Sequence, residues 1–151
     1  MLHVALLEPE IPPNTGNIAR LCAATGSRLH LIGRLGFQLD DRNLRRAGCD
    51  YWDSVDSLLH ENFEEFEKTT GLKRIFCLSA HAQRSYTQAR FQDGDCLLFG
   101  SESRGLPASL LQRDPEFAFT IPMPATQVRS LNLATAAGIV LYEALRQIHA
   151  W

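Results

Sequence analysis

Residues 95–107 read DCLLFGSESRGLP, and this stretch is the clearest indication of the fold. The apolar run from Cys96 to Phe99 is typical of a strand that is buried on both faces of a parallel sheet. Gly100 ends the run, a polar loop follows as far as Gly105, and Pro107 can begin a helix. Because α/β proteins bind ligands where a strand meets such a loop and helix, we predict a ligand beside this loop. The alternative is an ordinary turn with solvated charges.

A similar unit opens the chain. His3 to Leu7 is an apolar run that leads into a proline-rich loop, and the apolar side chains of residues 14–26, NTGNIARLCAATG, have helical spacing. Asn14 or Thr15 is predicted to cap this helix, and Gly26 to end it.

A third unit closes the chain. Phe117 to Ile121 predicts a last strand, and an apolar stripe of helical period begins at Asn132. Ser130 and Asn132 therefore stand at the start of a C-terminal helix. If the sheet is parallel, the loops of all three units meet at one of its edges.

The remaining segments predict an α/β fold, with one parallel sheet flanked by helices in a single domain spanning residues 1–151. Arg28 to Ile32 and Arg74 to Ser79 read as further strands. Ser57 to Thr70 reads as an acidic surface helix ended by Gly71, with these apolar side chains inward: Leu58, Leu59, Phe63 and Phe66.

Two places could contact a phosphate backbone. Asn14, Asn17 and Arg20 lie near a helix start, where free N–H groups and a guanidinium favour an anion. Residues 40–48 predict a short helix with a basic face formed by Arg42, Arg45 and Arg46. The alternative at both places is a solvated surface, with Asn14 serving as a helix cap.

The composition narrows the class of protein. The chain has 151 residues, of which 45% are hydrophobic, and a formal net charge of −2, which argues against non-specific coating of nucleic acid. The four cysteines are widely spaced and predict reduced core residues: Cys22, Cys49, Cys77 and Cys96. Neither a long apolar segment nor a signal peptide is evident, so we expect a soluble, cytoplasmic protein.

The three loops together offer amide and hydroxyl donors, one carboxylate and one guanidinium. They contain no metal-ligand cluster, no Cys–His pair, no nucleophile elbow and no phosphate-binding Gly-Lys loop, so no metal site is predicted. Such an inventory fits the transfer of a group from a carrier molecule, where binding and orientation supply most of the catalysis.

Three motifs resemble those of the SPOUT RNA methyltransferases and occur in the same order: NTGNIAR (residues 14–20), LFGSESRGLP (98–107) and IPM…RSLNLATA (121–136). The resemblance covers nearly the whole chain and is greatest to the smallest branch, the tRNA (cytidine/uridine-34)-2′-O-methyltransferases. It implies a deep trefoil knot in the C-terminal half, S-adenosylmethionine as methyl donor, and a homodimer that builds each active site from both chains. The implied acceptor is the 2′-hydroxyl of nucleotide 34 in leucine tRNAs.

The resemblance also implies roles for the residues that match the motifs. Those expected at the methyl donor are Leu78, Gly100, Glu102, Gly105, Ile121, Ser130 and Leu131. Those expected in the catalytic shell are Arg20, Glu102, Ser130 and Asn132. Those expected to contact RNA are Asn14, Asn17, Arg20, Arg42, Arg45, Arg46 and Arg129.

Arg20 is expected near the ribose 2′-oxygen. A guanidinium is normally protonated, so we favour stabilisation of a developing alkoxide by Arg20 over a role as base, and a clamp on a neighbouring phosphate is the third possibility. Two alternatives remain for the whole chain: a 2′-O-methyltransferase acting on another tRNA or ribosomal RNA position, or an RNA-binding module without catalysis.

Overall fold

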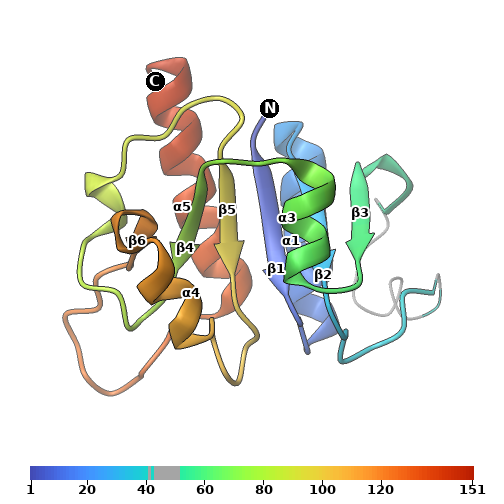
Figure 1. Ribbon diagram of the computed structural model, residues 1–151, viewed down its shortest axis with the longest axis horizontal. Coiled ribbons are helices and arrows are strands. Elements are labelled where there is room, and N and C mark those ends of the chain that lie inside the picture. The colour runs from blue at the N-terminus through green and yellow to red at the C-terminus, as the bar shows by residue number, and fades with distance from the viewer. Residues whose placement is uncertain (41, 43–51) are drawn as a thin grey trace.

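In the part of the chain that the structure describes, the sheet has six strands, all parallel, in the order β3-β2-β1-β5-β4-β6 (Figure 1). The structure is a computed structural model that describes residues 1–40, 42 and 52–151. The strands are β1 (His3–Leu7), β2 (Arg28–Ile32), β3 (Ser57–His60), β4 (Ile75–Leu78), β5 (Cys96–Phe99) and β6 (Ala118–Phe119). The prediction of a parallel α/β sheet is therefore confirmed.

Helices cover both faces of this sheet. Their bounds are α1 (Pro12–Thr25), α3 (Phe63–Thr70), α4 (Ala108–Arg113) and α5 (Leu133–His149). Figure 1 shows α1 and α5 behind the sheet and α3 and α4 in front of it. The carboxyl ends of the strands all point to the lower edge of that view, so the loops that follow them meet there.

The pattern along β5 explains why it lies at the centre. Leu97 and Phe99 join the core cluster formed with α1 and α5, whereas Cys96 and Leu98 join the cluster under α3 and α4. Successive strand residues point to opposite faces, so a continuous apolar run fills both cores. Every residue of β5 is buried, as the sequence predicts.

The prediction of a helix over Ser57 to Thr70 is wrong in its first half. Residues 57–60 form β3, which pairs with β2 at the edge of the sheet, and α3 begins after Asn62. Leu58 and Leu59, expected inward, are 43% and 64% exposed. A short apolar run fits a strand or a helix equally well, and here pairing with β2 decides between them. Asn62 then caps α3 by accepting from the Glu65 N–H.

Helix α1 begins earlier than predicted. Pro12 and Pro13 occupy its first positions, where a missing N–H costs nothing, and Ile11 is the residue before the helix. Asn14 and Thr15 are consequently not caps but buried residues of the first turn. Pro107 likewise precedes α4 and does not begin it.

Several other sequence predictions can be compared with the structure. Gly26 ends α1 with a φ of 66°, as predicted, and Asn132 stands at the start of α5, as predicted, where its side chain also caps the helix. The predicted strand Phe117 to Ile121 is reduced to Ala118–Phe119. Cys22, Cys77 and Cys96 are buried and free, as expected. Cys49, Arg45 and Arg46, which the sequence predictions also name, lie outside the described residues.

Three histidines form a row across β1, β2 and β3. The Nδ1 atom of His3 lies 2.9 Å from His30 Nε2, and His30 Nδ1 lies 2.9 Å from His60 Nε2. Phe66 packs edge-on against the rings of His30 and His60. Neutral imidazoles satisfy both contacts, since each supplies one N–H donor and one bare acceptor nitrogen. Burial is the main cause that lowers the pKa of His30 to about 3, and it also lowers those of His3 and His60.

This row makes stability depend on pH. The unfolded chain protonates its histidines below their usual pKa of 6.5, while the folded chain keeps His30 neutral, so the unfolded state binds more protons in acid. We expect the free energy of unfolding to be highest above pH 6.5 and to fall as the pH drops toward 3. His30 alone contributes about 1.4 kcal/mol per pH unit. Urea denaturation at pH 7.5 and 5.5 measures the difference.

The control for this prediction is His81→Gln, which removes an exposed imidazole after β4, on the other half of the sheet. The variant should retain the pH dependence of the wild type. Equal stability of the wild-type protein at the two pH values would contradict the assignment of a neutral row.

Candidate active site

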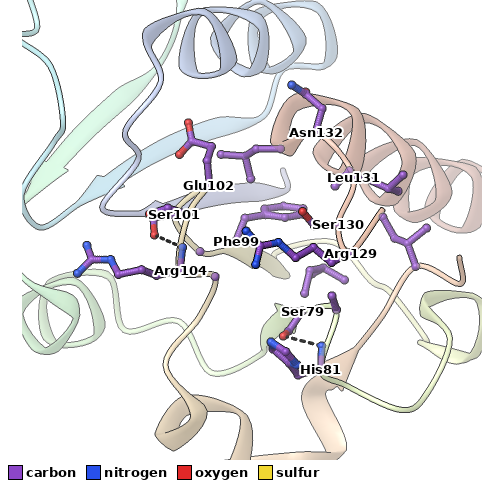
Figure 2. Close-up of a pocket in the computed structure, with 18 of the residues that line it drawn as sticks. Ser79, His81, Phe99, Ser101, Glu102, Arg104, Arg129, Ser130, Leu131 and Asn132 are labelled. Atoms are coloured by element: carbon purple, nitrogen blue, oxygen red, sulfur yellow. Dashed lines mark hydrogen bonds between the residues drawn. The ribbon is translucent and has the colours of Figure 1, made fainter. Parts of the chain in front are cut away.

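A pocket of about 500 Å³ opens at the carboxyl edge of β4, β5 and β6, where α5 begins (Figure 2). Its volume is within the range of small-molecule sites. The pocket brings together every residue expected at the methyl donor: Leu78, Gly100, Glu102, Gly105, Ile121, Ser130 and Leu131. These residues come from segments that are far apart in the sequence, and the strand order explains their meeting, because β5 lies next to β4 and β4 next to β6.

The loop after β5 closes tightly on itself. A Cβ atom on Gly100 would lie 2.0 Å from the carbonyl carbon of Gly105 and 2.3 Å from the nitrogen of Leu106. The Gly105 N–H donates to the Ser101 carbonyl at 2.8 Å, and Gly105 has a φ of 66°, which favours glycine. Both glycines are thus needed to bring the two ends of the loop into contact beneath the pocket.

Glu102 points from this loop toward the start of α1. Its carboxylate accepts hydrogen bonds from the main-chain N–H groups of Glu10 at 2.9 Å and Ile11 at 2.7 Å, and from Asn14 Nδ2 at 3.2 Å. Figure 2 shows Glu102 and Asn132 at one end of the pocket and Ser79 and His81 at the other. With its oxygens occupied by N–H donors, Glu102 is better suited to holding the loop than to abstracting a proton.

Asn132 connects the same network to α5. Its Oδ1 accepts from the Thr135 N–H at 3.2 Å, and its Nδ2 donates to Asn14 Oδ1 at 2.9 Å. Asn14 therefore bridges Glu102 and Asn132, so the starts of α1 and α5 and the loop after β5 form one hydrogen-bonded unit. All three side chains line the pocket.

Arg20 and Asn17 are placed differently from the other predicted site residues. Both are exposed on α1, and neither is among the described residues that line this pocket, whereas Asn14, in the first turn, is. Arg20 is six residues beyond Asn14, about 9 Å along the helix axis at the usual rise. A single chain thus does not bring Arg20 to the pocket. Of the other predicted RNA contacts, Arg129 lines the pocket and Arg42 is exposed.

Sequence reasoning missed the contribution of the loop after β4. Ser79, Ala80 and His81 line the pocket, and the Ser79 hydroxyl accepts from the His81 main-chain N–H at 3.1 Å. These residues follow a buried strand, which is where ligand-binding loops occur. Their place in this pocket, however, depends on β4 lying beside β5, and no pattern in the sequence indicates that pairing.

The chemistry of the pocket is that of binding and orientation. Hydroxyl, amide and main-chain groups alternate with apolar side chains, and these groups suit a small organic ligand with polar ends. Among the described residues, no group of three or more His, Cys, Asp or Glu side chains is placed to hold a metal ion. No helix of the described ranges is long and apolar enough to span a membrane.

Known proteins resemble this chain both in sequence and in structure. Residues 1–142 match the SpoU rRNA Methylase family. The tRNA (cytidine(34)-2′-O)-methyltransferase of Escherichia coli K12 is 48% identical over 149 residues, covering 98% of this chain and 94% of the relative.

Solved structures extend the comparison to three dimensions. One, described as giving insights into the 2-OH methylation of C/U34 on tRNA, is 51% identical with a TM-score of 0.92, and covers 100% of this chain and 98% of that chain. An AdoMet-bound rRNA methyltransferase from Sinorhizobium meliloti is 28% identical with a TM-score of 0.83, and covers 96% of this chain but 56% of that chain.

Proposed function

The chain belongs to the SpoU rRNA Methylase family, and from that premise we propose that it transfers a methyl group from S-adenosylmethionine to the ribose 2′-hydroxyl of nucleotide 34 of tRNA. The observation that carries the proposal is the pocket at the carboxyl edge, where the three sequence motifs meet. The relatives of similar length supply the acceptor, since they are named for cytidine 34 or C/U34 of tRNA. By the resemblance of the sequence, the acceptor molecules are leucine tRNAs.

The pocket residues fit the methyl donor. The turn made by Gly100 and Gly105 lines the pocket, and it depends on glycine because a Cβ atom at Gly100 would collide with the backbone of Gly105. Ser130 adds a hydroxyl, and the apolar side chains of Leu78 and Ile121 lie beside these polar groups. S-adenosylmethionine supplies a positively charged sulfonium, a good leaving group, so in-line orientation of the acceptor is the main task of the protein.

Arg20 acts, in this proposal, in the pocket of a second copy of the chain. Its place on the exposed side of α1, outside the pocket of its own chain, supports this assignment. A homodimer would then supply the donor pocket from one protomer and the guanidinium from its partner. The guanidinium would stabilise the negative charge that develops on the 2′-oxygen as its proton leaves for solvent. The oxygen would then form its bond to the methyl carbon as the bond from that carbon to the donor's sulfur breaks, with the electron pair staying on sulfur.

Further parts of the proposal follow from the resemblance. Residues 1–151 form a single methyltransferase domain of the SPOUT fold with a C-terminal trefoil knot, and the enzyme acts in the cytoplasm, where tRNA is found. Asn14, Asn17, Arg42, Arg45, Arg46 and Arg129 contact the RNA. An acceptor in ribosomal RNA is the second candidate, since a neighbour of similar fold is an rRNA methyltransferase.

Donor titration and label transfer test the proposed function. We expect calorimetry to show saturable binding of S-adenosylmethionine, and label from the donor's methyl group to enter bacterial tRNA but not DNA of the same sequence. Label in ribosomal RNA alone would favour the second candidate, an acceptor in ribosomal RNA. Donor binding without label in any RNA would contradict methyl transfer.

A further inference from the structure

Two loops beside the pocket hold each other through a pair of carboxylates. Glu102, in the loop after β5, accepts from the main-chain N–H groups of Glu10 at 2.9 Å and Ile11 at 2.7 Å. In return, Glu10 Oε1 accepts from the Ser103 main-chain N–H at 3.1 Å and from its hydroxyl at 2.5 Å. Each loop thus supplies a carboxylate that binds the main chain of the other. The members of this reciprocal link are 91 to 93 residues apart in sequence.

A third loop, the one after β2, also contacts the main chain at Glu10. The Gly36 N–H donates to the Pro9 carbonyl at 2.9 Å. A Cβ atom on Gly36 would lie 2.8 Å from Glu10 Cα, so the loop after β2 is in close contact with the main chain of Glu10. The hydrogen bonds from Ser103 also hold the pKa of Glu10 below its usual value, and the carboxylate is therefore charged at neutral pH. Glu10 is a fixed, charged acceptor at the meeting point of three loops.

The link joins the loop that lines the donor pocket to the start of α1. Ser103 is in the loop that lines the donor pocket, and Glu10 is two residues before α1. Helix α1 carries Asn14 of the same pocket and Arg20, which we place in the partner's pocket. Because Asn14 of α1 lines the same pocket as the loop, a change in the distance between loop and helix would alter how the pocket orients the donor, and a misplacement of about 1 Å can cost about a hundredfold in rate.

We propose that Glu10 is a positioning residue, which acts through Ser103 to fix the donor loop relative to α1. This inference rests on the proposed methyl transfer. The donor loop retains its own internal contacts without Glu10, since Gly105 N–H still donates to Ser101 and the Arg104 N–H to the Ser101 hydroxyl. Loss of the link should therefore affect turnover more than donor binding.

Glu10→Ala and Ser103→Ala, alone and together, provide the kinetic test. We expect kcat to fall at least about tenfold in each, with the Kd for S-adenosylmethionine within about threefold of wild type. Because Glu10 accepts both hydrogen bonds from Ser103, the double variant should lose about as much turnover as Glu10→Ala alone. Glu10→Gln keeps an oxygen that accepts from Ser103 and should recover most of the turnover.

The matched control is Glu8→Gln. Glu8 is in the same loop, and its carboxylate pairs with Arg104 of the donor loop at 2.8 Å, but the two side chains are 39% and 69% exposed. An exposed ion pair contributes little, so kcat should stay within about twofold of wild type. An equal fall in kcat in Glu8→Gln and Glu10→Ala would indicate a general effect of removing a negative charge, and it would overturn the proposal.

Hydrogen exchange tests the link independently of activity. In Ser103→Ala, the main-chain amide of Ile11, which Ser103 does not touch, should exchange faster, because Glu102 is held less firmly against it. Unchanged exchange at Ile11, or faster exchange with kcat unchanged, would overturn the positioning role. If the wild-type protein transfers no methyl group, the proposed function fails, and the exchange result still decides whether the two loops are coupled.

Discussion

Gly100→Ala is expected to abolish binding of S-adenosylmethionine and, with it, methyl transfer. The added Cβ would lie 2.0 Å from the Gly105 carbonyl carbon and 2.4 Å from its oxygen, distances at which the backbone must move. The turn between these glycines forms the floor of the pocket, so the loop would have to open. We expect the Kd for the donor to rise at least about a hundredfold, equivalent to about 2.7 kcal/mol. Calorimetric titration measures this change.

Gly138→Ala is the control for that substitution. Gly138 is inside α5, and a Cβ there would meet no atom within 4 Å. Alanine should raise helix stability by about 0.5–1 kcal/mol without changing donor affinity. Near-normal donor affinity in Gly100→Ala, with circular dichroism unchanged, would contradict the placement of the donor over this turn.

Arg20→Lys is expected to lose most of its turnover although it keeps the positive charge. The planar guanidinium presents several N–H donors in a fixed geometry, whereas an ammonium group is a hydrated point charge on a flexible stem. If Arg20 stabilises the developing alkoxide, kcat should fall about a hundredfold. Single-turnover rates with saturating tRNA measure the change, and a near-normal rate would contradict a role for the fork geometry.

Mixed dimers test where Arg20 acts. Arg20→Ala and Gly100→Ala should each be inactive alone. When the two are co-expressed, half of the dimers are mixed, and each mixed dimer has one site with both residues intact. Activity should therefore return to about a quarter of the wild-type value. No recovery in isolated mixed dimers would place Arg20 in the pocket of its own chain.

The sequence predicted the central part of the site because the signals there are local. The apolar run of β5, the glycine that ends it and the polar loop all lie within residues 95–107, and each has a direct structural meaning. The place of Asn132 at the start of α5 was predicted for the same reason, since the apolar stripe of helical period begins there.

The parts that were missed depend on contacts between distant segments. The apolar pair Leu58 and Leu59 was assigned to a helix, and pairing with β2 made it a strand. The carboxylate of Glu102 reaches the N–H groups of Glu10 and Ile11, which no spacing in the sequence indicates. The contribution of Ser79 likewise depends on which strands are neighbours. Local patterns predicted the units of the fold, and tertiary packing decided their partners.

The most direct test of the whole account is the position of the transferred methyl group. Total bacterial tRNA is incubated with the wild-type protein and labelled S-adenosylmethionine, then digested with nucleases, and the labelled fragments are identified by mass. We predict label on the 2′-oxygen of nucleotide 34 and none when Arg20→Ala replaces the wild type. Label at another nucleotide, or label that persists in Arg20→Ala, would contradict the account.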